Sequence, residues 1–179
     1  IATLPVVIIG GTAQHYGIIN QIMNIGVIGY SMIFFGIILF ISDKNNEEKI
    51  FQKSISQKDA LIIGLYQILA LIPGTSRSGI TITGARFLKY KRIDAAKFSF
   101  LLSIPTLFAA FILSSFEIYK LGEINFNFIL LISFFFSFIF SFITIKYFLI
   151  FLKKFSLNLF VIFRIILGII LLFFYYSNH

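Results

Sequence analysis

The sequence contains no cysteine and no tryptophan, and it has little proline, little histidine and little acidic charge. The absence of cysteine excludes disulfides, thiol catalysis and cysteine-based metal sites. Its 2 histidines, His15 and His179, argue against a zinc site made of protein ligands alone. Asp and Glu together number only 7, and none of them lies inside an apolar run. The apolar segments therefore offer no general base for acid–base chemistry.

Hydrophobic residues, in contrast, make up 59% of the 179 positions, and 25 residues are Phe. A soluble domain of this length has too small an interior for that content, whereas an integral membrane protein accommodates it. The Lys and Arg residues that give the net charge of +8 cluster in short loops between apolar runs, which is typical of cytoplasmic anchoring. We therefore predict an all-α integral membrane protein, a polytopic helical bundle, and expect no nucleic-acid partner.

The apolar runs predict the helices of a single membrane domain over residues 1–179. We expect membrane helices at 1–11, 25–41, 95–116, 126–152 and 157–176, with polar connections at 12–24 and 42–59. Pro105 predicts a kink in its helix, and the lysines from Lys44 to Lys58 are expected to be solvated. Because Ile1 lies inside an apolar run and is not Met, we interpret the chain as N-terminally truncated.

Residues 60–88 differ from the other apolar runs, because a polar heptapeptide, Pro73-Gly-Thr-Ser-Arg-Ser-Gly79, divides them. Each half, 60–72 and 79–88, is shorter than the roughly 20 residues that a spanning helix needs. We therefore predict a re-entrant hairpin that enters the membrane and returns to the same side.

The distribution of basic residues supports this topology. If 60–88 is re-entrant, the loops 42–59, 89–94 and 153–156 share one side of the membrane and carry nine Lys and Arg residues. The opposite side carries only Lys120. The positive-inside rule then places the first side in the cytoplasm and the C-terminus outside.

The heptapeptide has the chemistry of a polyanion cradle. Pro73 and Gly74 end the first half-helix, and the second half-helix directs free N–H groups and a partial positive charge at the loop. Arg77 adds a planar fork of donors suited to phosphate. Hydroxyl donors come from Ser76, Ser78, Thr81 and, further along, Thr83. The alternative, that small polar residues only allow close helix packing, does not explain an arginine at this depth.

Two other polar residues lie inside apolar segments. Arg164 is roughly 12 Å along the last predicted helix, at 1.5 Å per residue, and needs a partner at that depth. The sequence leaves open whether it pairs with a carboxylate from elsewhere or contacts a lipid diphosphate. Gln67 is expected to orient the loop through a hydrogen bond.

The stretch Gln67–Thr81, with its pattern Pro-Gly-x-Ser-Arg-Ser-Gly-x-Thr, resembles the undecaprenyl-diphosphate phosphatase family, the membrane enzymes linked to bacitracin resistance. Phe98–Pro105 and Phe163-Arg164 are similar to later stretches of the same family. The likeness extends over essentially the whole chain and covers the C-terminal two thirds of the family's length.

The resemblance implies a hydrolase of the bacterial inner membrane that removes the terminal phosphate of a polyprenyl diphosphate, recycling the lipid carrier for peptidoglycan and conferring bacitracin resistance. The implied catalytic residues are Arg77, Ser76, Ser78 and Thr81. The implied substrate-binding residues are Gly74, Thr75, Gly79, Arg164 and Gln67. Whether Ser76 attacks phosphorus or only donates hydrogen bonds is left open.

The resemblance also implies an inverted-repeat architecture, of which this chain contains half, and a divalent cation, Mg or Ca. Family members hold the cation with carboxylates of an earlier hairpin, which also carries a serine and a histidine. No such motif occurs in this chain, so we expect the ligands in the missing N-terminal part and no metal ligand here. A homodimer is a further expectation. The alternative function is a transporter or flippase for an anionic lipid or solute, since broken helices and inverted repeats are also transporter features.

Overall fold

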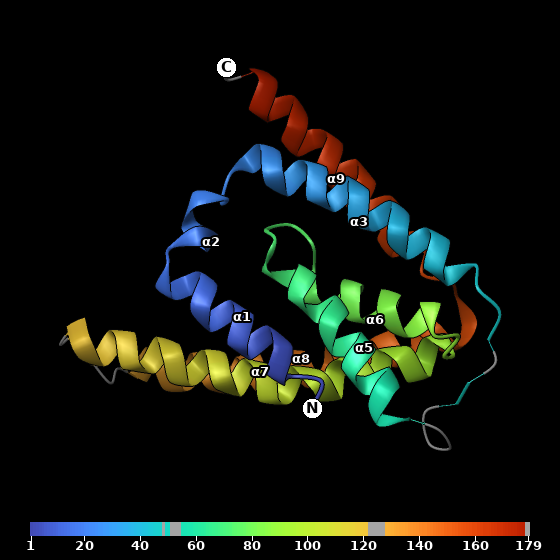
Figure 1. Ribbon diagram of the computed structural model, residues 1–179, viewed down its shortest axis with the longest axis horizontal. Coiled ribbons are helices and arrows are strands. Elements are labelled where there is room, and N and C mark those ends of the chain that lie inside the picture. The colour runs from blue at the N-terminus through green and yellow to red at the C-terminus, as the bar shows by residue number, and fades with distance from the viewer. Residues whose placement is uncertain (48, 51–54, 122–127, 178–179) are drawn as a thin grey trace.

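The computed structural model describes residues 1–47, 49–50, 55–121 and 128–177, and it consists of helices joined by short connections (Figure 1). Their bounds are α1 (Leu4–His15), α2 (Ile18–Gln21), α3 (Ile25–Asp43), α5 (Gln57–Ile68), the 3-10 turn η1 (Leu69–Leu71), α6 (Arg77–Phe87), α7 (Arg92–Leu121), α8 (Phe128–Lys154) and α9 (Asn158–Ser177). Within the described residues the only β-type pairing is an isolated bridge between Lys49 and Tyr90.

Among the described helices, α3, α7, α8 and α9 are long and apolar enough to cross a membrane, with mean hydropathy between 1.9 and 2.6. They confirm the spans predicted at 25–41, 95–116 and 157–176, and also the one predicted at 126–152 from Phe128 on, since its first two residues lie outside the described part of the chain. In α7 the helix continues through Pro105, and the bend expected there stays a prediction. Lys120 and His179 fall on residues whose side chains lie outside the described part of the chain.

The connection predicted at 12–24 is in part wrong. The first helix continues to His15, and the short α2 follows at Ile18–Gln21. The hydroxyl of Thr12 lies 3.1 Å from the carbonyl oxygen of Ile8 and 2.9 Å from that of Ile9. A threonine satisfied by the preceding turn does not end a helix, which is why its polarity was a poor stop signal.

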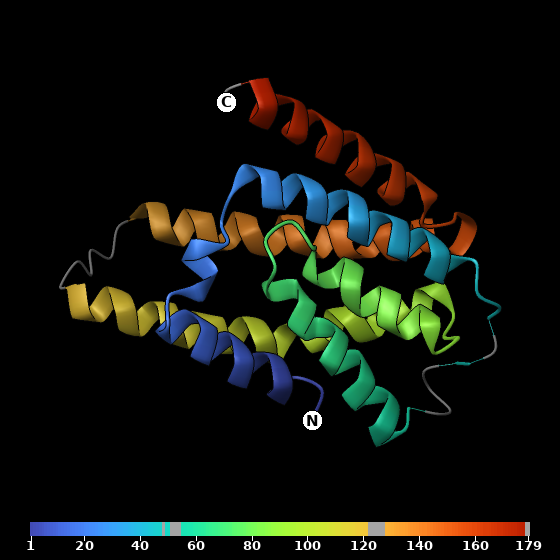
Figure 2. The same cartoon turned by 45° about the horizontal axis from the view of Figure 1, so that its top comes forward.

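Helices α5 and α6 form the predicted hairpin. Figure 1 shows both of its ends at the right of the molecule and its loop in the middle, well short of the left-hand ends of α7 and α8. The turned view in Figure 2 shows the same arrangement. The chain thus returns to the end at which it entered, as the distribution of basic residues indicated.

A buried carboxylate joins the helices at this returning end. Asp43, at the end of α3, is 4% exposed. It accepts from Arg92 Nε at 2.7 Å and from the backbone N–H of Leu157 at 3.2 Å, and it lies 3.5 Å from Arg86 Nε. Helices α3, α6 and α7 and the residue just before α9 therefore meet at one acid.

Lys49, within the run from Lys44 to Lys58 that was expected to be solvated, keeps 39% of its side chain exposed. Its ammonium pairs with Asp59 at 3.1 Å, and Asp59 also accepts from the Tyr90 hydroxyl at 2.7 Å. The sequence places Asp43 and Asp59 near helix ends, but it contains no signal that their carboxylates are buried in the fold.

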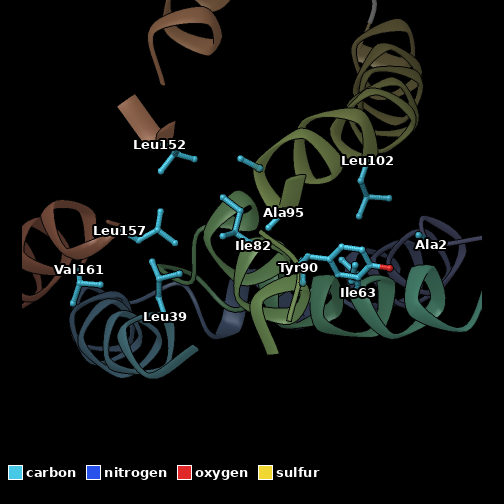
Figure 3. Packing of buried hydrophobic residues seen from close by; sticks show 12 residues of the cluster. Ala2, Leu39, Ile63, Ile82, Tyr90, Ala95, Leu102, Leu152, Leu157 and Val161 are labelled. Carbon is cyan, nitrogen blue, oxygen red and sulfur yellow. The ribbon is translucent and has the colours of Figure 1, made fainter. Parts of the chain in front are cut away.

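The apolar core lies around the hairpin. Figure 3 shows Ile82 of α6 near the middle, with Leu39 of α3 and Val161 of α9 on one side and Ile63 of α5, beside Tyr90, on the other. The long helix α8 lies at the edge: Leu152 is buried, whereas Phe134 and Phe140 are 76% and 62% exposed. Exposed aromatics of this kind suit contact with lipid.

Helices α3 and α9 approach each other at a pair of glycines. A Cβ atom placed on Gly168 would lie 2.9 Å from the carbonyl oxygen of Gly29. Small residues at helix crossings are the usual means of close packing in membranes. This crossing determines how close α9, which carries Arg164, lies to the hairpin.

Candidate anion-binding site

The hairpin loop has an unusual backbone. Gly74 has a φ of 87°, and a Cβ atom at this position would lie 2.6 Å from the carbonyl oxygen of Ile28 on α3. Glycine is required here both for its dihedral and for the close approach. The loop tip is thereby seated against the first turn of α3.

Ser76 also has a positive φ, 66°, which is uncommon for a residue with a side chain. Its hydroxyl oxygen accepts from the backbone N–H of Gly79 at 3.3 Å and caps α6. Ser76 is nevertheless exposed. A strained, exposed serine at the start of a helix is typical of a functional site, because strain persists only where the surrounding structure enforces it.

Arg164 reaches the loop from α9. Only 6% of the residue is exposed, and its Nη2 donates to the carbonyl oxygen of Gly74 at 3.0 Å. Its Nη1 lies 3.2 Å from the position that a Cβ on Gly79 would occupy. The guanidinium therefore extends along the loop from Gly74 to Gly79, which lie on either side of Ser76.

Both arginines at the loop have donors that are not used within the described part of the chain. Arg77 Nη1 and Arg164 Nε are buried without a hydrogen-bond partner. The ion pairs found among the described residues join Lys49, Arg86 and Arg92 to acids at the other end of the hairpin, and none involves Arg77 or Arg164.

Buried cationic donors without a counter-charge are costly, and an anion at the loop would satisfy them. Within the described residues, the structure thus excludes a carboxylate partner for Arg164. A carboxylate from elsewhere in the full-length protein or a bound anion would each satisfy the free Nε donor of Arg164, so both alternatives stay predictions.

The loop threonines and serines divide into two groups. Thr81 is 1% exposed, and its hydroxyl lies 2.6 Å from that of Ser99 on α7 and 3.0 Å from the carbonyl oxygen of Arg77. The hydroxyl of Thr83 donates to the carbonyl oxygen of Gly79. These hydroxyls are used within the fold and hold α6 in place.

In the second group, Ser76 and Ser78 are exposed, and the buried hydroxyl of Thr75 has no partner among the described residues. These three residues, on either side of the strained turn, leave hydroxyl groups available to a ligand. Sequence reasoning grouped Thr81 with them because it lies one helical turn from Arg77, a spacing that does not reveal a partner on another helix.

Gln67 makes a side-chain hydrogen bond, as expected, but its partner lies on α7 and not in the loop. Its Nε2 donates to the hydroxyl of Thr106 on α7 at 3.0 Å. With the contact between Thr81 and Ser99, this bond fixes both arms of the hairpin to α7. Ser99 and Thr106 were missed from the sequence, although a hydroxyl stripe along one face of that helix, continued by Ser103, could have indicated them.

The site lacks a metal-binding group in the residues that the structure describes. No three His, Cys, Asp or Glu side chains among them lie close enough together to hold a metal ion. The side chains gathered at the loop are arginine guanidiniums and hydroxyl groups.

The fold defines a polytopic α-helical membrane protein whose helical hairpin has two arginines at its loop. A family model described as "Bacitracin resistance protein BacA" matches residues 1–170. The chain belongs to this family.

Similar proteins support the assignment. An "Undecaprenyl-diphosphatase" of Pelagibacter ubique (strain HTCC1062) is 43% identical over 99% of this chain and 69% of its own length. Proteins of the same name from Jannaschia sp. (strain CCS1) and Ruegeria pomeroyi are 40% and 37% identical and are matched over 64% and 66% of their lengths. The chain thus spans about two thirds of the length of these curated relatives.

Proposed function

We propose that this chain forms the diphosphate-binding part of an undecaprenyl-diphosphatase, which hydrolyses undecaprenyl diphosphate to the monophosphate. Membership of the BacA family and the names of relatives at 37–43% identity support the activity. The single observation that carries the assignment of the site is the pair of buried arginine donors, on Arg77 and Arg164, without partners in the described residues.

The proposed roles follow from the position of each group. The Arg77 and Arg164 guanidiniums bind the diphosphate oxygens, and the first turn of α6 adds backbone N–H groups. As the P–O bond to the terminal phosphate breaks, negative charge grows on the oxygens that the arginines contact. Donors already in place stabilise that charge without reorganisation, which is usually the largest contribution to catalysis. Ser76, Ser78 and Thr75 complete the cradle with hydroxyl donors.

We further propose that a divalent cation takes part, with ligands outside the described residues. The side chains at the loop do not form a metal site by themselves, so no step of the reaction is assigned to the ion here. The inner membrane of a bacterium as the location, the C-terminus on the outer side and a homodimeric assembly belong to the same proposal.

Phosphate release from undecaprenyl diphosphate by the full-length protein in detergent or proteoliposomes tests the activity. Arg77→Ala should lower the rate by about a hundredfold or more, because it removes a donor for transition-state charge. Lys97→Ala, which removes an exposed cation on α7, should leave the rate unchanged. Hydrolysis that is insensitive to Arg77→Ala would show that the loop is not the site.

The same preparation separates hydrolysis from transport. Movement of labelled lipid across liposomes without phosphate release would replace the proposed hydrolase with a flippase. If Arg77→Ala altered neither phosphate release nor lipid movement, the loop would be the site of neither hydrolysis nor transport.

The orientation can be tested because this chain contains no cysteine. A cysteine introduced at Ser177, the last residue of α9, should react with an impermeant maleimide added from outside intact cells. A cysteine at Asn46, near the end of α3, should react only after the cells are opened. The reverse pattern would contradict the proposed topology.

A further inference from the structure

An apolar groove runs along α3 beside the hairpin loop. It has a volume of about 510 Å³ and is lined by Tyr30, Ser31, Ile33, Phe34, Phe35, Ile37 and Ile72. All but the last of these belong to α3. Ile72 comes from the chain just before Pro73, where the backbone leaves η1 and becomes extended.

The groove is continuous with the anion-binding loop. Gly74 lies against the backbone of Ile28, so the loop tip is level with the first turn of α3. From Ile28 to Ile37 the helix covers about 14 Å, at 1.5 Å per residue. A ligand with its anionic head at the loop would find an apolar surface leading along α3 toward the centre of the span.

Three other hollows in the described structure are poorer candidates for the same ligand. The cavity of about 390 Å³ near Asp43 and Arg86 is charged and lies at the opposite end of the hairpin. A hollow of about 550 Å³ on α9 has no lining residue from the loop. The cavity between α1, η1 and α7 is about 190 Å³ and contains the polar side chains of Gln14 and Thr106.

We propose that the groove on α3 binds the first isoprene units of the prenyl chain while the hairpin loop holds the diphosphate. This inference rests on the proposed function and specifies which surface recognises the lipid. Its basis is connectivity: the chain is covalently attached to the head group, and the groove is the apolar surface that starts at the loop. Aliphatic and aromatic side chains on α3 supply the dispersion contacts that a branched hydrocarbon needs.

Filling the groove should distinguish long from short substrates. Ile37→Trp adds bulk at the end of the groove far from the loop. Ile37 is 45% exposed, so the fold can accommodate a larger side chain there. We expect kcat/KM for undecaprenyl diphosphate to fall about tenfold in the full-length protein, a typical effect of altered apolar fit. Hydrolysis of isopentenyl diphosphate, whose chain is too short to reach this point, should be unchanged.

The matched control is Ile41→Trp, one turn further along the same face of α3, 53% exposed and outside the groove lining. It should affect neither substrate. Equal losses on both substrates with Ile37→Trp, or no loss on either, would overturn the groove as the chain-binding surface while leaving the hydrolase intact. If the wild-type protein hydrolysed neither substrate, the proposed function itself would fail.

A direct measurement does not depend on turnover. A prenyl diphosphate with a diazirine a few isoprene units from its head group should label peptides that contain Phe34 or Ile37, and unlabelled undecaprenyl diphosphate should displace it. A diazirine phospholipid should label the same face without being displaced. If the prenyl probe were not displaced either, the groove would hold bulk lipid and the proposal would be wrong.

Discussion

Arg164 and Gly74, 90 positions apart in the chain, are joined by a hydrogen bond of 3.0 Å from the guanidinium to the loop carbonyl. This bond turns the end of the Arg164 side chain along the loop rather than toward lipid. It also leaves Nε buried without a partner within the described residues. The last membrane helix therefore contributes a cation to a site whose sequence motif lies entirely in the hairpin.

Replacing this arginine should weaken substrate binding without unfolding the protein. Arg164→Lys keeps the charge but loses the planar fork, so it cannot contact both Gly74 and an anion. We expect kcat/KM to fall by about tenfold to a hundredfold, the value of one or two charged hydrogen bonds. Steady-state phosphate release measures this. Lys146→Ala, an exposed cation on α8, is the control, and an equal loss there would remove the specific role of Arg164.

The loop glycine should not tolerate any side chain. Gly74→Ala would place a Cβ atom 2.6 Å from the carbonyl oxygen of Ile28 at a φ of 87°, so loop or helix must move. We expect a lower melting temperature in detergent and loss of activity. Gly11→Ala is the matched change, because nothing lies within 4 Å of a Cβ at that position in α1. There, alanine should be neutral or stabilising by up to about 1 kcal/mol. Equal behaviour of the two variants would contradict the loop geometry.

Thr81 and Ser99 should behave as a structural pair. Thr81→Val removes the 2.6 Å partner of the Ser99 hydroxyl and leaves it only a long contact, 3.5 Å, with the carbonyl oxygen of Ser78. A buried polar group left unpaired costs about 1–3 kcal/mol. Thr81→Ser retains the hydroxyl and should remain close to wild type in stability and activity.

A double-mutant cycle with Ser99→Ala completes this test. The double variant should recover part of the stability lost by Thr81→Val, because no hydroxyl is then left unpaired. If Thr81→Val retained full stability but lost activity, direct contact of Thr81 with substrate would be the better explanation.

The carboxylate at the inner end of the bundle should matter more for stability than any other acid that the structure describes. Asp43→Asn leaves Arg86, which is 0% exposed, without its buried counter-charge. Breaking such a pair costs about 3–5 kcal/mol. Glu47→Gln removes an acid whose side chain is 37% exposed, and its effect should stay below about 1 kcal/mol. Thermal unfolding of both variants in one detergent gives the comparison, and similar melting temperatures would contradict the central position of Asp43.

Much of the fold could be predicted because apolar length and charge are local properties of the chain. The spans at 25–41 and 157–176 follow from runs that have no other way to bury themselves, and the hairpin follows from two halves too short to cross. Thr12 shows the limit of this reasoning: its polarity suggested a helix end, but its hydroxyl bonds within the helix and α1 continues.

The pairing of side chains could not be predicted in the same way. Asp43 and Leu157 lie tens of residues from Arg86 and Arg92, and the sequence contains no signal that these four residues meet. The same holds for Thr81 with Ser99 and for Gln67 with Thr106. In the unfolded chain, each of these side chains could meet several polar groups. Only the packing of the helices determines which of them becomes its partner.

By itself, the sequence determined that this protein has the apolar helices of a membrane protein, that residues 60–88 form a hairpin, and that Arg77 lies in its loop, for which phosphate binding stays a prediction. Hydrophobic length, helix breakers and the chemistry of a guanidinium are sufficient for those conclusions. Only the tertiary structure decided that Arg164 joins the same loop, that Thr81 is used within the fold and that a groove on α3 begins at Ile72. These depend on how closely α3, α9 and the hairpin approach, and the close contact of Gly29 with Gly168 sets that approach for α3 and α9.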